Sequence, residues 1–70
     1  MPTTTDPRPV VHPIRAFRQR RKWPQRELGW RAKLSESQIS AFELGWMKPR
    51  PGQLKRIARA LGVRVEDLLA

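Results

Sequence analysis

The chain has 70 residues and no cysteine, and fifteen lysines and arginines against six acidic residues give it a net charge of +9. This length suits one domain, whose core is small because a chain of this size buries only about 60% of its unfolded surface. The lack of cysteine excludes disulfide bridges and cysteine-ligated zinc, and His12 has no second histidine with which to share a metal. The charge favours a polyanionic partner, nucleic acid above all.

Other classes of protein find little support in the composition. No apolar run approaches the roughly 20 residues of a membrane span, and residues 1–13 lack the apolar core of a secretory signal, so we expect a cytoplasmic protein without a membrane partner. The chain has no tyrosine, and its serines at 35, 37 and 40 have no neighbouring base. We therefore predict no enzymatic activity, no metal and no cofactor.

Residues 1–12 are rich in proline and contain little to bury, so they predict a flexible arm ahead of a single domain over 13–70. Pro13 suits the first turn of a helix that ends at about Arg21, because Pro24 follows shortly after.

Two short helices joined by a tight turn are predicted next, over about 25–33 and 36–44. Ser35 can cap the second helix, and Gln38 three residues later completes a capping box. Gly45 suits the left-handed position that ends a helix. Gly29 lies inside the first helix at a cost of about 1 kcal/mol relative to alanine, so we expect another segment to pack closely against it.

The C-terminal third predicts two further helices after a loop over 46–50. Pro51 opens the first, and Gly62 ends it. Its apolar stripe has the i, i+3, i+4, i+7 spacing of Leu54, Ile57, Ala58 and Leu61. A short fifth helix follows, with two acidic residues in its first turn. No strand-like alternation occurs, so the predicted fold class is all-α with five helices.

Short patterns in several of these elements resemble one family. They are Gln25 with Glu27-Leu28, Ile39-Ser40 with Phe42-Glu43 and Gly45, and Pro49 followed by Leu54, Ile57-Ala58, Ala60-Leu61-Gly62-Val63 and Asp67-Leu68. Over about 14–69 the chain resembles the Cro/CI-type (XRE, lambda-repressor-like) helix-turn-helix family. The resemblance implies a five-helix lambda-repressor-like domain, whose second and third helices form the helix-turn-helix unit and bind double-stranded DNA.

The resemblance also implies how the DNA is contacted. The third helix, about 36–44, would enter the major groove and read bases through Glu36, Ser37, Ser40 and Ala41. The phosphate contacts would come from Gln25, Arg26, Gln38, Lys48 and Arg50. No arginine lies on the reading face, so we expect sparse direct readout and a large share of specificity from DNA shape. For Glu36 the alternative is a helix-dipole residue without a base contact, and for Gln38 a cap alone.

Two further roles follow from family position. Arg18 and Glu43 would form a partly buried ion pair that ties the first helix to the third; otherwise they are two separate surface charges. The dimer interface of a homodimer would be formed by Val65, Leu68 and Leu69, although the same residues could simply close the core.

The chain departs from the family in the turn and in its apolar surface. Lys33 stands where the family often has glycine, and a lysine with positive φ is uncommon. Trp30 and Leu44 fill positions that the family commonly keeps polar. Together with Trp46 and Met47 they either pack on each other or on the loop, or form a surface for a protein partner, and Trp46 could also lie along DNA sugars. We therefore expect a small dimeric Cro-like repressor on a pseudo-palindromic operator. The alternatives are an antitoxin or a restriction-modification controller of the same fold, or a protein-interaction module that uses the Trp30/Trp46 surface.

Overall fold

The computed structural model describes residues 12–69 and confirms the expected all-α architecture. Its helices are α1 (Pro13–Arg20), α2 (Gln25–Ala32), α3 (Glu36–Glu43), α4 (Pro51–Leu61) and α5 (Val65–Leu68). Within this part of the chain, no helix is both long and apolar enough to cross a membrane. The predicted arm lies outside the described residues except for His12, whose Nδ1 accepts the Ile14 N–H at 3.1 Å and caps α1.

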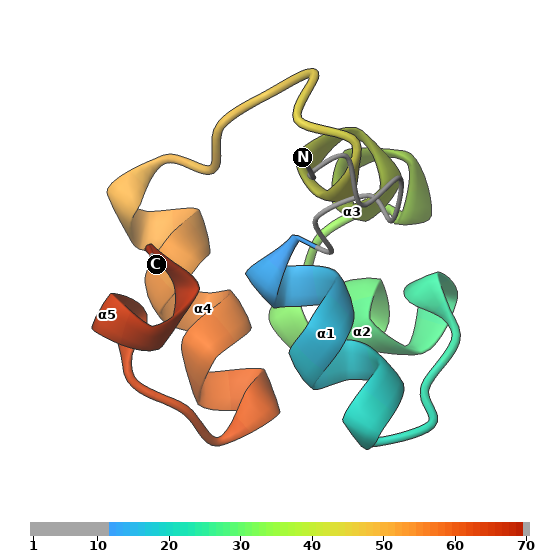
Figure 1. Ribbon diagram of the computed structural model, residues 1–70. Coiled ribbons are helices and arrows are strands. Elements are labelled where there is room, and N and C mark those ends of the chain that lie inside the picture. The colour runs from blue at the N-terminus through green and yellow to red at the C-terminus, as the bar shows by residue number, and fades with distance from the viewer. Residues whose placement is uncertain (1–11, 70) are drawn as a thin grey trace, which may run out of the picture.

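The core lies where the helices meet. α2 packs against both α3 and α4, and α1 crosses α3, α4 and α5. α4 and α5 lie on one side of the molecule and α1 and α2 on the other, and the loop from α3 to α4 arches across one end (Figure 1). The core is made of the apolar stripes predicted from helical spacing, with Ile14, Leu28, Ala32, Ile39, Phe42, Leu54, Ile57, Ala58, Leu61 and Leu68 buried.

The first four helices all end in the same hydrogen-bonded turn. After α3, the N–H of Trp46 bonds the carbonyl of Ala41 at 2.9 Å, and the N–H of Gly45 bonds that of Phe42 at 3.1 Å. This is the Schellman arrangement, which satisfies carbonyls that the end of a helix leaves unpaired. Equivalent pairs of bonds close the other three helices, around Lys22, Lys33 and Gly62.

Each of these turns needs one residue in the left-handed region. Gly45 and Gly62 adopt positive φ, as their positions predicted. Lys22 and Lys33 do so as well, each with a φ of 59°. A side chain with a Cβ is strained there by roughly 1–2 kcal/mol, because the Cβ approaches the following carbonyl oxygen. The chain therefore keeps two lysines where glycine would be relaxed.

Two arginines connect helix ends that are distant in sequence. Arg21 Nη2 donates to the carbonyl of Leu61 at 2.9 Å, at the end of α4. Arg56 Nε donates to the carbonyl of Ala32 at 2.9 Å, at the end of α2. Both place a positive charge at the negative end of a helix dipole, which stabilises that helix. Each bond also holds the helix against the segment that carries the arginine.

Gly29 is where α2 meets the turn that leads into α3. A Cβ built on Gly29 would lie 2.7 Å from the carbonyl oxygen of Leu34, which is closer than such atoms approach in proteins. The neighbour is backbone, and the Leu34 N–H already bonds the Gly29 carbonyl at 2.7 Å. The expected close packing against this glycine is thus present, and it fixes the approach of α3 to α2.

Replacing Gly29 with alanine should destabilise the fold by about 1–3 kcal/mol, because the added methyl group forces the backbone of the turn to move. The free energy of unfolding, measured with urea, gives the effect directly. Gly52→Ala is the matched control, since a Cβ at Gly52 would meet nothing within 4 Å and alanine favours a helix. Equal or greater stability of Gly29→Ala would contradict the close packing.

Candidate nucleic-acid interface

The burial of two side chains sets the rotation of α3. Ile39 and Phe42 are fully buried, so the opposite face of the helix turns outward. On that face lie the predicted base readers: Glu36 and Ser37 are exposed, and Ser40 and Ala41 are half-buried. The N-terminal turn of α3 therefore presents a small, polar surface whose single charge is the carboxylate of Glu36.

The start of α3 is held by the predicted capping box. Ser35 Oγ accepts the N–H of Gln38 at 3.0 Å, and Gln38 Oε1 accepts the N–H of Ser35 at 3.0 Å. Both bonds satisfy donors at the point where α3 begins, so its first turn is rigid. The cap uses the carbonyl end of Gln38 and leaves the amide nitrogen of this side chain able to donate outward.

The other end of α3 is held by a buried ion pair. Arg18 Nε lies 2.7 Å from Glu43 Oε2, and Arg18 Nη2 donates to Glu43 Oε1 at 3.0 Å, a two-bond pairing of fork to carboxylate. The side chains are only 11% and 3% exposed. Arg18 Nη1 also donates to the carbonyl of Trp23 at 2.7 Å. One guanidinium thus connects α1, the loop before α2, and α3.

Gln25 joins the same network. Its Nε2 donates to Glu43 Oε1 at 3.0 Å, so the side chain predicted to contact phosphate is half-buried against the end of α3. Among the described residues, every buried side-chain nitrogen or oxygen has a hydrogen-bond partner. The network therefore fixes the N-terminus of α2 beside the C-terminus of α3, with the exposed Arg26 next to it.

The loop after α3 carries the predicted phosphate contacts Lys48 and Arg50, and both are exposed. The loop is anchored at each end: the Schellman turn holds its start, and the N–H of Arg50 donates to Gln53 Oε1 at 2.8 Å where α4 begins. Figure 1 shows this loop spanning from α3 to α4. Positive charge accordingly lies near the C-terminal end of α3, and the acidic Glu36 lies at the other end.

The predicted interface residues at the C-terminal end of the chain differ in burial. Leu68 is 4% exposed and belongs to the core, whereas Leu69 is 67% exposed and Val65 is half-buried. Val65 and Leu69 line an apolar hollow of about 470 Å³ together with Leu54. Val65 and Leu69 thus keep exposed apolar surface, whereas Leu68 belongs to the core.

Sequence reasoning missed the two arginines that cap helix ends, because no local pattern marks a bond between residues 21 and 61 or between 56 and 32. It left open whether the tryptophans near the unit pack against neighbours. Trp30 is 76% exposed and Trp46 is 78% exposed, so both indoles lie largely in solvent.

We expect Glu43→Ala to destabilise the fold by about 3–5 kcal/mol, since it leaves the Arg18 guanidinium buried without its anion. Glu36→Ala removes the same charge from an exposed position and should change the unfolding free energy by less than about 1 kcal/mol. Thermal or urea unfolding of the two variants measures the difference. Equal stability of the two variants would show that the ion pair contributes nothing beyond a surface charge.

Comparison with known proteins agrees with this arrangement. The family model described as Helix-turn-helix matches residues 14–68. An uncharacterised HTH-type transcriptional regulator, y4dL, from Sinorhizobium fredii is 41% identical over 56 residues, which cover 80% of this chain. The chain spans 29% of the length of that relative.

Two solved structures have the same fold. The DNA-binding domain of the P22 C2 repressor superposes with a TM-score of 0.78 at 32% identity, covering 81% of this chain and 75% of that chain. A hypothetical transcription factor, NHTF, from Neisseria superposes with a TM-score of 0.78 at 31% identity, covering 83% of this chain and 67% of that chain. The chain belongs to the Cro/CI-type (XRE) helix-turn-helix family of DNA-binding transcription regulators.

Proposed function

We propose that the protein binds a pseudo-palindromic operator as a homodimer, with α3 of each copy in the major groove, and represses transcription in the manner of a small Cro-like regulator. The observation that carries this proposal is the rigid, outward-facing first turn of α3, held by a capping box at one end of the helix and by a buried ion pair at the other. Similarity to the DNA-binding domain of the P22 C2 repressor supports it.

The proposed base readers have modest recognition chemistry. Glu36 can accept a hydrogen bond from the amino group of cytosine, Ser37 and Ser40 can pair with several bases, and Ala41 can contact the methyl group of thymine. The face lacks arginine, which makes the commonest specific contact, to guanine. We therefore propose that few bases are read directly and that the shape of the operator contributes much of the specificity.

The proposed phosphate contacts surround this face. Lys48 and Arg50 supply charge from the loop after α3, and Arg26 supplies it from the first turn of α2. The amide groups of Gln25 and Gln38 would add neutral donors close to helix N-termini, where the dipole favours phosphate. Such contacts set the position of the protein on the duplex and make its affinity depend on salt.

We assign the dimer contact to the exposed apolar surface of Val65 and Leu69, with Leu68 behind it. A homodimer built on this surface would present two recognition helices to half-sites about 34 Å apart, one turn of the DNA helix. Dimerisation also supplies the affinity that one short, faintly acidic reading surface lacks.

Footprinting on the DNA around the gene for this protein tests the proposal. We expect protection of two half-sites, related by two-fold symmetry and about 34 Å apart, on one duplex. Protection that covers a single half-site at all protein concentrations would contradict the dimer. Absence of any salt-sensitive protection, on this DNA or on duplexes recovered by binding-site selection, would contradict the DNA-binding function itself.

On the protected duplex, Lys48→Ala should weaken binding to all sequences alike and reduce the slope of log affinity against log salt by about one. Arg20→Ala is the matched control, because it removes an exposed charge that lies over the Phe17 ring on α1. This variant should leave the slope unchanged. Equal slopes for the two variants would place the loop after α3 away from the phosphates.

A further inference from the structure

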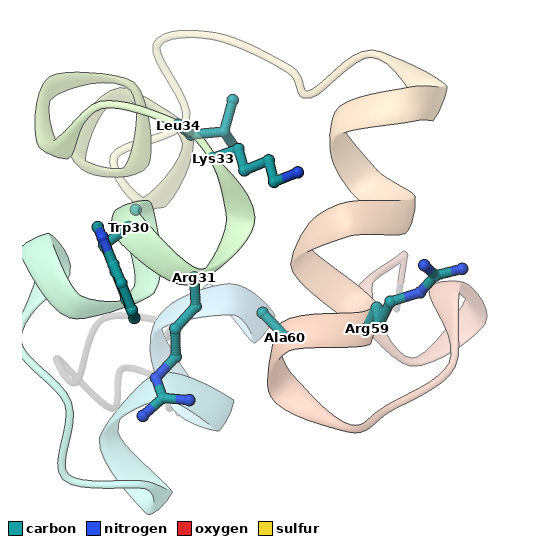
Figure 2. Close-up of a pocket in the computed structure, with 7 residues that line it drawn as sticks. Trp30, Arg31, Lys33, Leu34, Arg59 and Ala60 are labelled. Atoms are coloured by element: carbon teal, nitrogen blue, oxygen red, sulfur yellow. The ribbon is translucent and has the colours of Figure 1, made fainter.

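A basic groove with an apolar floor lies between the turn after α2 and the C-terminal half of α4. It has a volume of about 770 Å³ and opens to solvent. Trp30, Lys33 and Leu34 line it from the α2 side, and Arg59 and Ala60 from α4 (Figure 2). None of the proposed base readers of α3 lines it.

Trp30 gives the groove an exposed apolar surface. Its side chain is 76% exposed, although tryptophan is normally well buried. The close contact of Gly29 with the backbone of Leu34 fixes α2 against the turn, so the indole stands on a rigid support. A rigid aromatic side chain with two rotatable bonds is the kind of group that anchors protein interfaces, because little conformational entropy is lost when it is covered.

The charges around the groove have one sign. A second hollow of about 180 Å³ adds Arg56 and shares four residues with the groove, namely Arg31, Lys33, Arg59 and Ala60. Arg56 is already oriented by its bond to the carbonyl of Ala32. In residues 12–69, no acidic side chain lines either hollow. A ligand that is acidic and partly apolar therefore complements this surface in both charge and polarity.

Two cations carry most of the unpaired charge. Arg31 also lines the groove, but Glu27 lies 2.7 Å from its Nε and its guanidinium stacks over the Trp23 ring at 4.4 Å. Lys33 and Arg59 form no ion pair among the described residues, and the Lys33 side chain extends from the turn toward α4 (Figure 2). Those two side chains are thus the ones available to meet carboxylates.

The backbone at Lys33 is strained in the same way as that at Lys22, which does not line the groove. Lys33 has a φ of 59°, a conformation in which glycine would be relaxed and lysine is strained. Strain of this kind is a reason to look for a function of the side chain that the chain retains at that position. Here the retained side chain is a cation at the edge of an apolar groove.

We propose that this groove docks an acidic segment of a partner protein. An apolar side chain of the segment packs between Trp30 and Leu34, and flanking carboxylates meet Lys33 and Arg59. The floor of Leu34 and Ala60 fits an aliphatic or aromatic side chain, which the backbone of DNA does not offer, and none of the proposed base readers lines the groove. DNA and the partner would therefore bind to different surfaces of one chain.

The test uses the isotope-labelled 70-residue chain and a short synthetic peptide of aspartates and glutamates with one central leucine, followed by NMR titration. We expect shifts of the Trp30 indole N–H and of backbone amides over 29–34 and 56–60. Trp30→Ala should weaken peptide binding about tenfold, as loss of an interface anchor does. Lys33→Gly, which relaxes the turn and cannot harm folding through strain, should weaken it about two- to fivefold.

Trp46→Ala is the matched control, because it removes an equally exposed indole outside the groove and should leave peptide affinity unchanged. A peptide with serine in place of leucine should bind clearly more weakly; equal binding would reduce the interaction to charge attraction and overturn the proposal. Shifts confined to other residues would overturn it too. The alternative occupant is duplex DNA. If a duplex displaces the leucine peptide, binds in a salt-sensitive manner, and binds Trp30→Ala less well than the unchanged protein, the groove belongs to DNA instead.

Discussion

The buried pairing of Arg18 with Glu43 holds α1 and α3 together and reaches the start of α2. Buried charges are costly unless each is paired and its remaining hydrogen-bonding groups are satisfied. Here the guanidinium also holds the carbonyl of Trp23, and the carboxylate also holds the amide of Gln25. The same few atoms thus position α1, the start of α2 and the end of α3, and the burial of Ile39 and Phe42 turns the first turn of α3 outward.

The turns that end the helices determine how tightly the chain packs and which side chains lie at the surface. Four Schellman turns stop the helices sharply, so the short chain can pack five helices around one core. Two of the turns use glycine, and two use lysine at positive φ. The turn at Lys33 lies between α2 and α3 and also lines the basic groove beside Trp30. The close packing of Gly29, the strained backbone of Lys33 and the proposed docking surface beside Trp30 therefore lie within a few residues of one another.

Local features of the fold were predictable from the sequence because their causes are local. The capping box of Ser35 and Gln38, the core stripes and the glycines at 45 and 62 depend on spacing along a helix or on one backbone conformation. Contacts between distant residues were not. Arg21 and Arg56 bond to helix ends, and Gln25 bonds to Glu43, only after the helices have packed together. The sequence also contains many arginines, and nothing in their local sequence distinguishes the two that make these bonds. The Arg18–Glu43 pair was expected only from family resemblance, since nothing in the spacing of 25 residues indicates it.

A double-mutant cycle on Arg18 and Glu43 measures the energy of their pairing, with Arg18→Met, Glu43→Leu and the combined variant compared by urea unfolding. Each single substitution leaves one buried charge without a partner, whereas the combined variant removes both charges and keeps apolar volume. We predict that the combined variant is at least as stable as either single variant, with a coupling energy of about 2–3 kcal/mol. Losses of stability that simply add would show that the two side chains act independently, and would contradict the claim that their pairing holds α3 in place.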